Sequence, residues 1–441
     1  MEKTPKSLRL HIGLFGRTNV GKSSFLNLVA GQDVALTSPI PGTTTDVVEK
    51  AMELLPVGPV AFLDTGGLDD ASALGAGRVG RTRRALDRID VAVLLLEPNR
   101  WTTFEDELLG EFAARRTPVL AVINKTDLEE PASAFVESVR SKIPRVLQCA
   151  SQPFTGAERD RVVHRFKQHL LEMCPDHVVA APSLLGDLVP PGGLIVLIIP
   201  IDKEAPKGRI ILPQVQAIRD ALDHGEMVAV CRETEYIALL SQLAKPPDLV
   251  VCDSQVVHRM VAETPPGVKC TTFSILFSRF RGDLARQTEG AAAIDRLRPG
   301  NRVLIAEACT HHAVEDDIGR VKIPRWLKKH LGFDLEITVC SGRDWPEDVA
   351  SYSLIILCGA CMLTKREVLA RIEKAAAAGV PITNYGLCIS HLQGVLPRVL
   401  EPFLKGINVQ QPTSNNQQPT VGSWTLDVER WKLDRHAGSL P

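Results

Sequence analysis

A complete phosphate-binding loop lies near the start of the chain, where residues 16–24 read GRTNVGKSS. The apolar run 8–15 before the loop predicts a strand, and residues 23–29 after it predict the first turns of a helix. This strand–loop–helix context distinguishes a functional G-x-x-x-x-G-K-S loop from a chance match. Because such a loop needs both elements around it, the chain must begin with an α/β nucleotide-binding domain.

Each residue type in this loop has an expected role. Backbone N–H groups surround the phosphates at the positive end of the helix dipole. Lys22 is expected to reach the β- and γ-phosphates, and Ser23 to bind Mg²⁺. The predicted contacts to the nucleotide from this loop are Gly16, Arg17, Thr18, Asn19, Val20, Gly21, Lys22, Ser23 and Ser24.

A second segment, Asp64-Thr65-Gly66-Gly67, follows the apolar run 60–63. Its position predicts a carboxylate at a strand end, where Asp64 can hold the Mg²⁺ shell. The Gly67 N–H can then reach the γ-phosphate. With Lys22 and Ser23, we expect these residues to form the hydrolytic centre.

Two further segments indicate that the base is guanine. Asn124-Lys125-Thr126-Asp127 follows the predicted strand 118–123. A carboxylate at Asp127 can accept two hydrogen bonds from guanine that adenine cannot donate. Cys149-Ala150 follows the short strand 146–148 and is expected to close over the base. The four segments together predict binding of GTP and GDP.

The motifs resemble the branch of translation-factor-class GTPases that contains Era, Der and the tRNA-modification GTPase MnmE. In this resemblance, residues 41–46 (PGTTTD) match the first switch, and Thr44 matches the threonine that closes over Mg²⁺ and the γ-phosphate, so Thr44 is expected to bind Mg²⁺ and to complete the hydrolytic centre. Asn19 matches the asparagine that helps to hold K⁺ in potassium-activated members; a loop-stabilising amide is the alternative. Leu68 stands where many GTPases carry a glutamine, and Cys149 where serine is usual. The resemblance implies slow, K⁺-stimulated hydrolysis.

Length and composition exclude several classes of protein. The 441 residues predict two to four domains, and 44% hydrophobic residues suffice for their cores. A formal net charge of −1 argues against a nucleic-acid partner. The N-terminal residues lack an apolar signal region, and the longest apolar run, 194–201, is too short to cross a bilayer. Ten cysteines without a secretory signal indicate a reducing compartment, so we expect a cytoplasmic protein without a membrane partner.

Four regions are expected along the chain. A GTPase domain is predicted over 1–175, because the helical pattern 159–171 is broken by Cys174-Pro175-Asp176. A small α/β layer over 176–268 has no phosphate loop and no grouped titratable residues, which favours a structural or interaction role. Strand and helix patterns alternate again over 269–405, including a helix predicted over 282–297, and the polar segment 406–441 is predicted to be a disordered tail.

Cysteines follow two predicted strands of the third region. The strand 301–306 precedes Cys309 and His311, and the strand 352–357 precedes Cys358 and Cys361. Open α/β sheets place their ligands at the carboxyl ends of strands. These residues alone leave a zinc site, an iron–sulfur cluster and a redox dithiol open. The remaining cysteines are expected to be packed as small hydrophobic residues: Cys149, Cys174, Cys231, Cys252, Cys270, Cys340 and Cys388.

The combination of these regions resembles the HydF family, the GTPase maturation factors of iron–iron (FeFe) hydrogenases. The likeness spans about residues 6–404 and includes the strings at 271–277 and 282–284. The family pattern is Cys-x-His followed by His-Cys-x-x-Cys. Cys309, His311, Cys358 and Cys361 match it, whereas Leu357 stands in place of the second histidine.

The resemblance implies a scaffold in which Cys309, Cys358 and Cys361 hold a 4Fe–4S cluster. His311 is one candidate for the fourth ligand; Glu315, Asp316, water and a partner's cofactor are others. It also implies a homodimer through the middle domain that receives a transient diiron precursor from two radical-SAM maturases and delivers it to apo-[FeFe]-hydrogenase. Two alternatives remain: a ribosome- or tRNA-associated GTPase with a zinc domain, and a GTP-regulated thiol oxidoreductase.

Overall fold

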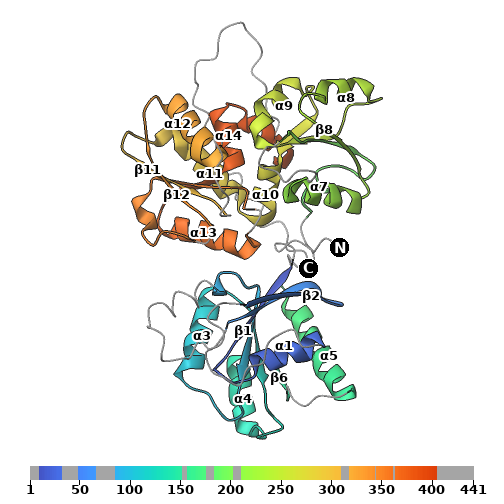
Figure 1. Cartoon of the computed structure of the whole chain (residues 1–441), viewed down its shortest axis with the longest axis vertical. Helices are drawn as coiled ribbons and strands as arrows, with labels where there is room; N and C mark the ends of the chain where they lie inside the picture. Colours follow the sequence, from blue (N-terminus) through green and yellow to red (C-terminus); the bar gives the residue numbers. More distant parts are fainter. Residues whose placement is uncertain are drawn as a thin grey trace. The chain divides into compact units, whose positions relative to one another are not determined.

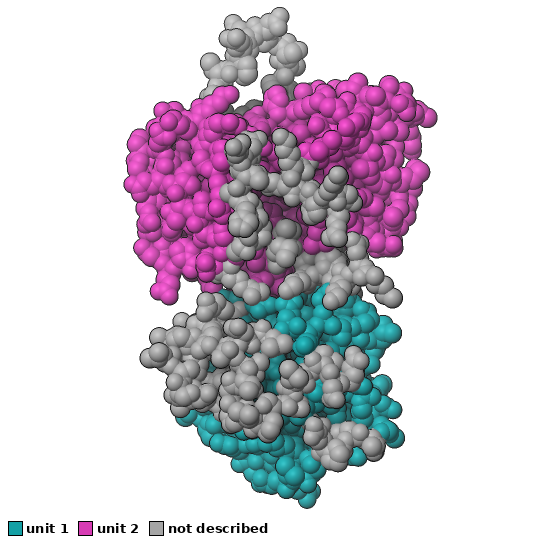
Figure 2. Space-filling view, in the orientation of Figure 1, with its two compact units in different colours: residues 1–182 teal, residues 183–441 magenta. Residues whose placement is uncertain are grey.

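The computed structural model of the chain describes residues 9–31, 48–65, 85–150, 156–174, 183–201, 210–308, 317–342, 344–360 and 363–404. The chain divides into two compact units, residues 1–182 and 183–441 (Figure 2). Among the described residues, no helix is both long and apolar enough to cross a membrane.

The first unit is built on a six-stranded sheet in the order β2-β3-β1-β4-β5-β6, in which only β2 is antiparallel to its neighbour (Figure 1). The strands are β1 (Leu10–Phe15), β2 (Val48–Leu54), β3 (Gly58–Asp64), β4 (Val91–Leu96), β5 (Val119–Ile123) and β6 (Val146–Gln148). The helices are α1 (Lys22–Ala30), α3 (Thr103–Ala114), α4 (Ser133–Lys142) and α5 (Ala157–Met173).

Both faces of this sheet are covered by helices. Phe25 of α1 and Phe166 of α5 pack on one face, and Phe112 of α3 and Val139 of α4 pack on the other. Every residue of β1 and β4 is buried, as expected for central parallel strands enclosed on two sides. The carboxyl ends of β1, β3 and β5 are therefore left to carry the loops with the nucleotide motifs.

The second unit contains two four-stranded sheets in the orders β10-β9-β7-β8 and β12-β11-β13-β14, with parallel pairing throughout. The first sheet comprises β7 (Leu194–Ile198), β8 (Met227–Cys231), β9 (Leu249–Cys252) and β10 (Lys269–Thr272). The second comprises β11 (Arg302–Ala306), β12 (Glu336–Cys340), β13 (Leu354–Leu357) and β14 (Ile382–Asn384). A GTPase-like α/β domain followed by further α/β layers was predicted, and this architecture is confirmed.

Helices cover both faces of each of these sheets (Figure 1). The middle sheet is covered by α7 (Leu212–Asp223), α8 (Tyr236–Gln242), α9 (Val257–Glu263) and α10 (Phe273–Arg281). Helix α13 (Lys365–Ala377) covers one face of the last sheet, and α11 (Leu284–Ala292), α12 (Ile323–Leu331) and α14 (Tyr385–Leu392) cover the other. The short helix α15 (Leu396–Leu400) ends the described chain, with the 3₁₀ turn Glu401–Phe403.

The two sheets share one hydrophobic core. Buried side chains of β7 and β9 belong to the same cluster as those of β11 and β13, joined through α10, α11 and α14. Helix α11 lies so close to β14 that a Cβ added at Gly290 would lie 2.0 Å from the Ile382 carbonyl oxygen. This shared core explains why the two α/β layers form one compact unit.

Two boundaries differ in detail from those suggested by the sequence. Strand β10 pairs with β9, so the middle sheet continues beyond residue 268, where the next domain was proposed to begin. The helix expected over 282–297 is divided into α11 and the 3₁₀ helix Ala293–Arg296. Asp283 caps α11, because its carboxylate accepts from the Arg286 N–H over 3.1 Å.

Candidate functional site

The phosphate loop connects β1 to α1 and depends on two glycines with positive φ. Gly16 has a φ of +139°, and an added Cβ would lie 2.5 Å from the Leu95 carbonyl oxygen. Gly21 has a φ of +97°, and an added Cβ would lie 2.3 Å from the Asn124 amide nitrogen. No larger residue fits at either place, so the loop closes tightly over the end of the helix. Asn19, also at positive φ (63°), is exposed.

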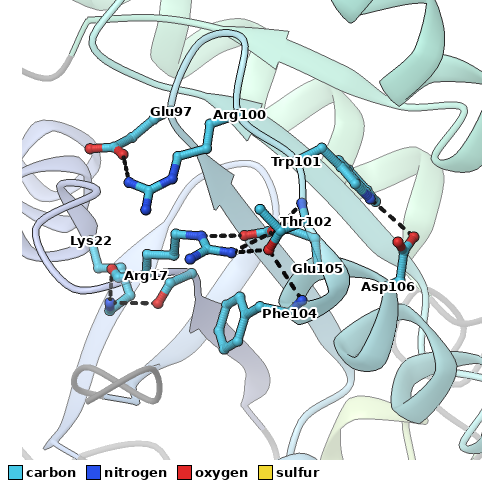
Figure 3. Close-up of polar contacts among 10 residues, drawn as sticks. Arg17, Lys22, Glu97, Arg100, Trp101, Thr102, Phe104, Glu105 and Asp106 are labelled. Atoms are coloured by element: carbon cyan, nitrogen blue, oxygen red, sulfur yellow. Dashed lines mark hydrogen bonds and ion pairs between the residues drawn. The ribbon is translucent and has the colours of Figure 1, made fainter. Parts of the chain in front are cut away.

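Lys22 is buried within this loop. Its ammonium donates to the carbonyl oxygens of Gly16 and Arg17, over 2.8 and 2.7 Å respectively (Figure 3). The side chain thus curls back beneath the loop from the first turn of α1, and this is the position from which a lysine can neutralise phosphate charge.

Two residues predicted to surround Mg²⁺, Ser23 at the start of α1 and Asp64 at the end of β3, contact each other. The Ser23 hydroxyl donates to Asp64 Oδ2 over 3.0 Å, and Asp64 ends β3 beside Leu14 of β1. The next residue, Thr65, donates its hydroxyl to the Leu14 carbonyl oxygen over 2.6 Å, which fixes the start of the following loop. Hydroxyl and carboxylate oxygens are the donors that Mg²⁺ prefers, so this pair fits the predicted ion.

The guanine motif is tied directly to the phosphate loop. Asn124 is buried at the end of β5, and its amide donates to the Val20 carbonyl oxygen over 2.9 Å. The Cys149 thiol lies 3.7 Å from Asn124 Oδ1, within the range of a sulfur hydrogen bond, and the Cys149 carbonyl accepts from the Thr126 N–H over 3.3 Å. Cysteine therefore performs the donor role that a serine hydroxyl would perform here. Asp127 is exposed, so its carboxylate is open to an incoming base.

A charged cluster beside the phosphate loop was not predicted from the sequence. Figure 3 shows Arg17 directed at Thr102 and Glu105 at the start of α3. Arg17 Nε lies 2.9 Å from Oε1 of Glu105, a carboxylate that is almost fully buried. Glu105 also closes a capping box by accepting from the Thr102 N–H over 2.8 Å. The T-x-x-E pattern could have identified this helix start, but nothing in it indicates Arg17 as a partner.

Lys125 of the guanine motif lies in a second charged group. Its ammonium is 2.8 Å from Glu97 Oε1, and Arg100 contacts the other oxygen of this carboxylate over 2.8 Å (Figure 3). Burial alone would raise the pKa of Glu97, but hydrogen bonds from Lys125 and Arg100 hold the pKa below its usual value. The motif's lysine is thus held in place by a carboxylate that stays ionised at neutral pH.

In the second unit, the predicted cysteine site lies where two neighbouring strands end. Ala306 of β11 is in register with Leu357 of β13, so the segments that follow them leave the sheet at one edge. Cys358 Sγ accepts from the Ala308 N–H over 3.0 Å and from the Ala360 N–H over 3.4 Å. Hydrogen bonds of this kind stabilise the thiolate form and tune the metal centres that thiolates hold.

Two buried arginines lie near Cys358, and sequence reasoning missed both. Arg281 of α10 donates to the Ala360 carbonyl oxygen over 3.3 Å and to Gln216 Oε1 over 2.8 Å. Arg371 of α13 donates to the Gly342 carbonyl oxygen over 2.7 Å. Burial lowers the pKa of Arg371, while the nearby sulfurs of Cys340 and Cys358 act in the opposite direction. A positive charge beside a sulfur favours a thiolate, although at Cys340 burial outweighs the Arg371 charge and raises the pKa of the thiol.

The other residues named in the sequence analysis are placed as follows. Cys252, Cys270 and Cys388 are fully buried, and burial raises the pKa of Cys270 to about 11 and of Cys388 to about 12, so their expected role as packed thiols is confirmed. Several predicted residues lie outside the described residues. They are Thr44, Gly66, Gly67 and Leu68 of the GTPase domain, the tail from 405, and Cys309, His311, Glu315, Asp316 and Cys361 of the cysteine region.

Three family models match consecutive parts of the chain. They are the 50S ribosome-binding GTPase model over residues 11–125, the hydrogen maturase F dimerization domain over 184–282 and the hydrogen maturase F tetramerization domain over 285–402. The first match shows that the phosphate loop, Asp64 and Asn124 belong to a GTPase domain, which binds and hydrolyses GTP with Mg²⁺.

Individual relatives match the GTPase domain. The tRNA modification GTPase MnmE of Herminiimonas arsenicoxydans is 43% identical over 123 residues, which is 27% of this chain and 26% of that protein. GTPase Der of Persephonella marina is 34% identical over 147 residues, 32% of this chain and 33% of the relative. The chain thus spans a third or less of the length of these relatives.

Among solved structures, an Era variant of Aquifex aeolicus bound to GDP and AlF₄⁻ covers 52% of this chain and 97% of its own, at 21% identity and a TM-score of 0.32. The two maturase models account for most of the second unit, with the β7–β10 sheet in one and the β11–β14 sheet in the other. With its GTPase domain followed by both of these domains, the chain belongs to the hydrogen maturase F (HydF) family.

Proposed function

We propose that this protein is a cytoplasmic GTP-hydrolysing scaffold that holds a 4Fe–4S cluster and a transient diiron precursor, and delivers the precursor to apo-[FeFe]-hydrogenase. The observation that carries the proposal is the Cys358 sulfur, which accepts N–H groups from the loops after both β11 and β13 within a hydrogen maturase F domain. Two radical-SAM maturases are the proposed source of the precursor.

For the nucleotide half, Lys22 would lie against the phosphates, and Ser23, Thr44 and Asp64 would form the Mg²⁺ shell. Asp127 would select guanine. With Leu68 after Gly67, hydrolysis would be slow, and Asn19 would help to bind a K⁺ that offsets transition-state charge. The exposed amide of Asn19 at the rim of the loop supports this role. GTP would act by biasing conformations that govern partner exchange rather than by redox chemistry.

For the cluster half, Cys309, Cys358 and Cys361 would be the thiolate ligands, with His311 as a candidate at the fourth iron. A 4Fe–4S cluster supplies a site at which a further metal unit can dock when one iron is weakly held. The fit rests on the chemistry around Cys358: two N–H donors to its sulfur, and the Arg371 charge, which offsets the negative charge of a thiolate-bound cluster.

The middle sheet is the proposed contact between two copies of the chain. The dimerization-domain match supports a homodimer. Strand β8 lies at an edge of its sheet, with Met227 and Val230 each 51% exposed. An unpaired apolar edge strand readily associates with another chain. We propose that the middle layer, residues 176–268 together with β10, carries this contact and that the remainder of residues 269–405 carries the cluster.

Strictly anaerobic expression followed by iron and zinc analysis tests the proposal. We expect about four irons per chain in the wild type and their loss in Cys358→Ala, with Cys340→Ala of β12, an edge strand of the same sheet, as the matched control that keeps its iron. GTP hydrolysis should be unchanged in Cys358→Ala, because the nucleotide site lies in the other unit. Stoichiometric zinc would favour a zinc-containing GTPase, and a reversible disulfide without metal would favour a thiol oxidoreductase.

A further inference from the structure

Three side chains far apart in the sequence meet on the surface of the last α/β layer, and none of them belongs to the cysteine loop. They are Asp295 of the 3₁₀ helix Ala293–Arg296, His330 of α12 and His391 of α14. His330 Nε2 lies 2.8 Å from Asp295 Oδ1, and His391 Nε2 lies 3.1 Å from the same oxygen. One candidate ligand atom from each residue lies within 4.8 Å of the others.

The spacing of these atoms matches a metal coordination shell. Ligands at about 2.0–2.2 Å from one ion lie roughly 3.0 Å apart at a right angle and roughly 3.4 Å apart in a tetrahedron. The two measured nitrogen–oxygen distances are close to these values. An ion could therefore enter between the three groups with small side-chain movements, with the imidazole protons moved to Nδ1.

The backbone around the three ligands is held by the core. Ile294, Leu327 and Ile389 are fully buried in the cluster shared by the two sheets, and each lies within three positions of one of the ligands. By contrast, the ligand side chains are partly exposed, at 56% for Asp295, 30% for His330 and 17% for His391. A rigid base and an open outer face are what a site needs if it is to admit an ion and keep a coordination position free.

The electrostatic environment of the three side chains favours a bound cation. His330 and His391 lie in the last turns of α12 and α14, where the helix dipoles are negative. Burial alone would raise the pKa of Asp295, but hydrogen bonds from His330 and His391 keep this pKa below its usual value, so the carboxylate is charged. Lys328 and Lys329 of α12 act against a cation, although the Lys328 ammonium is 2.9 Å from Asp334 Oδ2.

We infer that Asp295, His330 and His391 form a second metal site, separate from the cysteine loop and selective for a first-row divalent transition-metal ion. Two imidazoles and one carboxylate suit such ions, whereas Mg²⁺ and Ca²⁺ prefer shells made of oxygen. Three protein ligands leave at least one position for water or for a donor from another molecule. The site depends on neither GTP nor the iron–sulfur cluster.

Cobalt binding to the untagged, chelator-treated full chain tests this inference. The wild type should bind one more Co²⁺ per chain than His330→Ala or His391→Ala, with the affinity at this site reduced more than about 100-fold, because loss of an outer-shell partner alone costs 10–100-fold. His258→Ala, which removes an exposed histidine of α9 in the same unit, should match the wild type. Co²⁺ bound to cysteines gives intense thiolate charge-transfer absorption, whereas this site should give only weak visible bands.

Asp295→Asn keeps the shape of the side chain and can be titrated instead if either alanine variant fails to fold. It should also abolish the extra Co²⁺ and the rise in melting temperature that Zn²⁺ produces in the wild type. Identical Co²⁺ titrations for the wild type, Asp295→Asn and His330→Ala would overturn the inference. So would an extra ion accompanied by strong thiolate absorption.

Discussion

The Asn124 side-chain amide donates to the Val20 carbonyl oxygen over 2.9 Å, which joins the guanine motif to the phosphate loop. The other end of the same amide, Oδ1, lies 3.7 Å from the Cys149 sulfur. One buried side chain thus holds three loops of the nucleotide site in a fixed arrangement. Base recognition and phosphate binding are therefore mechanically coupled before any nucleotide enters.

This coupling predicts how the site responds to changes at Cys149. Cys149→Ser keeps a donor toward Asn124 and should bind GDP within about threefold of the wild type. Cys149→Val removes the donor but keeps the apolar volume, so Asn124 loses a partner and affinity should fall by about fivefold, as for loss of a hydrogen bond of roughly 1 kcal/mol. Titration calorimetry with GDP measures both. Equal affinities in the two variants would show that the sulfur contact has no role.

Asn19 provides a test of potassium activation. Because its φ is 63°, glycine can replace it without backbone strain, and Asn19→Gly removes only the amide. We expect wild-type hydrolysis to be faster in K⁺ than in Na⁺, and the two rates to become equal in Asn19→Gly while GDP affinity is kept. Phosphate release in matched chloride salts is the measurement. A variant that retains the full potassium stimulation would refute the role of Asn19.

Asp127 is predicted to determine the base. Asp127→Asn places an amide donor against the N2 amino group of guanine, so guanine binding should weaken by at least about 100-fold, since one hydrogen bond is lost and the other no longer goes to a charged group. Xanthine, which carries an oxygen at that position, should bind better than to the wild type. Competition between GDP and XDP measures the preference. An unchanged ratio would exclude Asp127 from base recognition.

The sequence predicted contacts that local motifs determine, but not those that tertiary packing determines. Ser23 and Asp64 could be paired in advance because strand–loop motifs place both at the ends of adjacent parallel strands. Arg281 and Ala360 are 79 positions apart, and their hydrogen bond exists only because α10 packs between the two sheets of the second unit. Likewise, His391 lies 96 positions from Asp295, and neither residue stands in a recognisable ligand pattern.

The split of the predicted helix 282–297 has a similar origin. The alanine-rich segment 291–293 contains no proline or glycine that would signal an end to α11. The chain nevertheless tightens into a 3₁₀ turn there, and Asp295 in that turn meets His330 and His391. Contacts with α12 and α14, which no local pattern encodes, thus accompany the change of helix type.

Glu226, at the start of β8, predicts a pH dependence of the second unit's stability. Its side chain is buried, and neither carboxylate oxygen has a hydrogen-bond partner among the described residues. Burial, reinforced by the charges of Asp220 and Asp187 and opposed by His224, raises the pKa of Glu226 to about 7. In the unfolded chain, the same carboxyl titrates near its ordinary value of about 4.3.

The direction of the pH dependence follows from the folded and unfolded pKa values of Glu226. Between pH 4.3 and 7, the folded state binds the proton that the unfolded state has released, so the free energy of unfolding falls as the pH rises through this window. The stabilising contribution is complete below the unfolded pKa and is lost above the folded pKa. At about 1.4 kcal/mol per pH unit, the loss amounts to about 4 kcal/mol at most.

Glu226→Gln should remove this slope, because an amide of the same shape does not titrate. Urea unfolding of the second unit between pH 5 and 8 would show a free energy that declines with pH in the wild type. In the variant, the free energy of unfolding should change less with pH. At pH 8 it should exceed that of the wild type by about 2–3 kcal/mol, because the variant has no ionised buried carboxylate. Glu289→Gln, on the exposed face of α11, is the matched control and should follow the wild type. Parallel pH profiles for the wild type and Glu226→Gln would mean that Glu226 stays ionised in the folded state, with its burial compensated elsewhere.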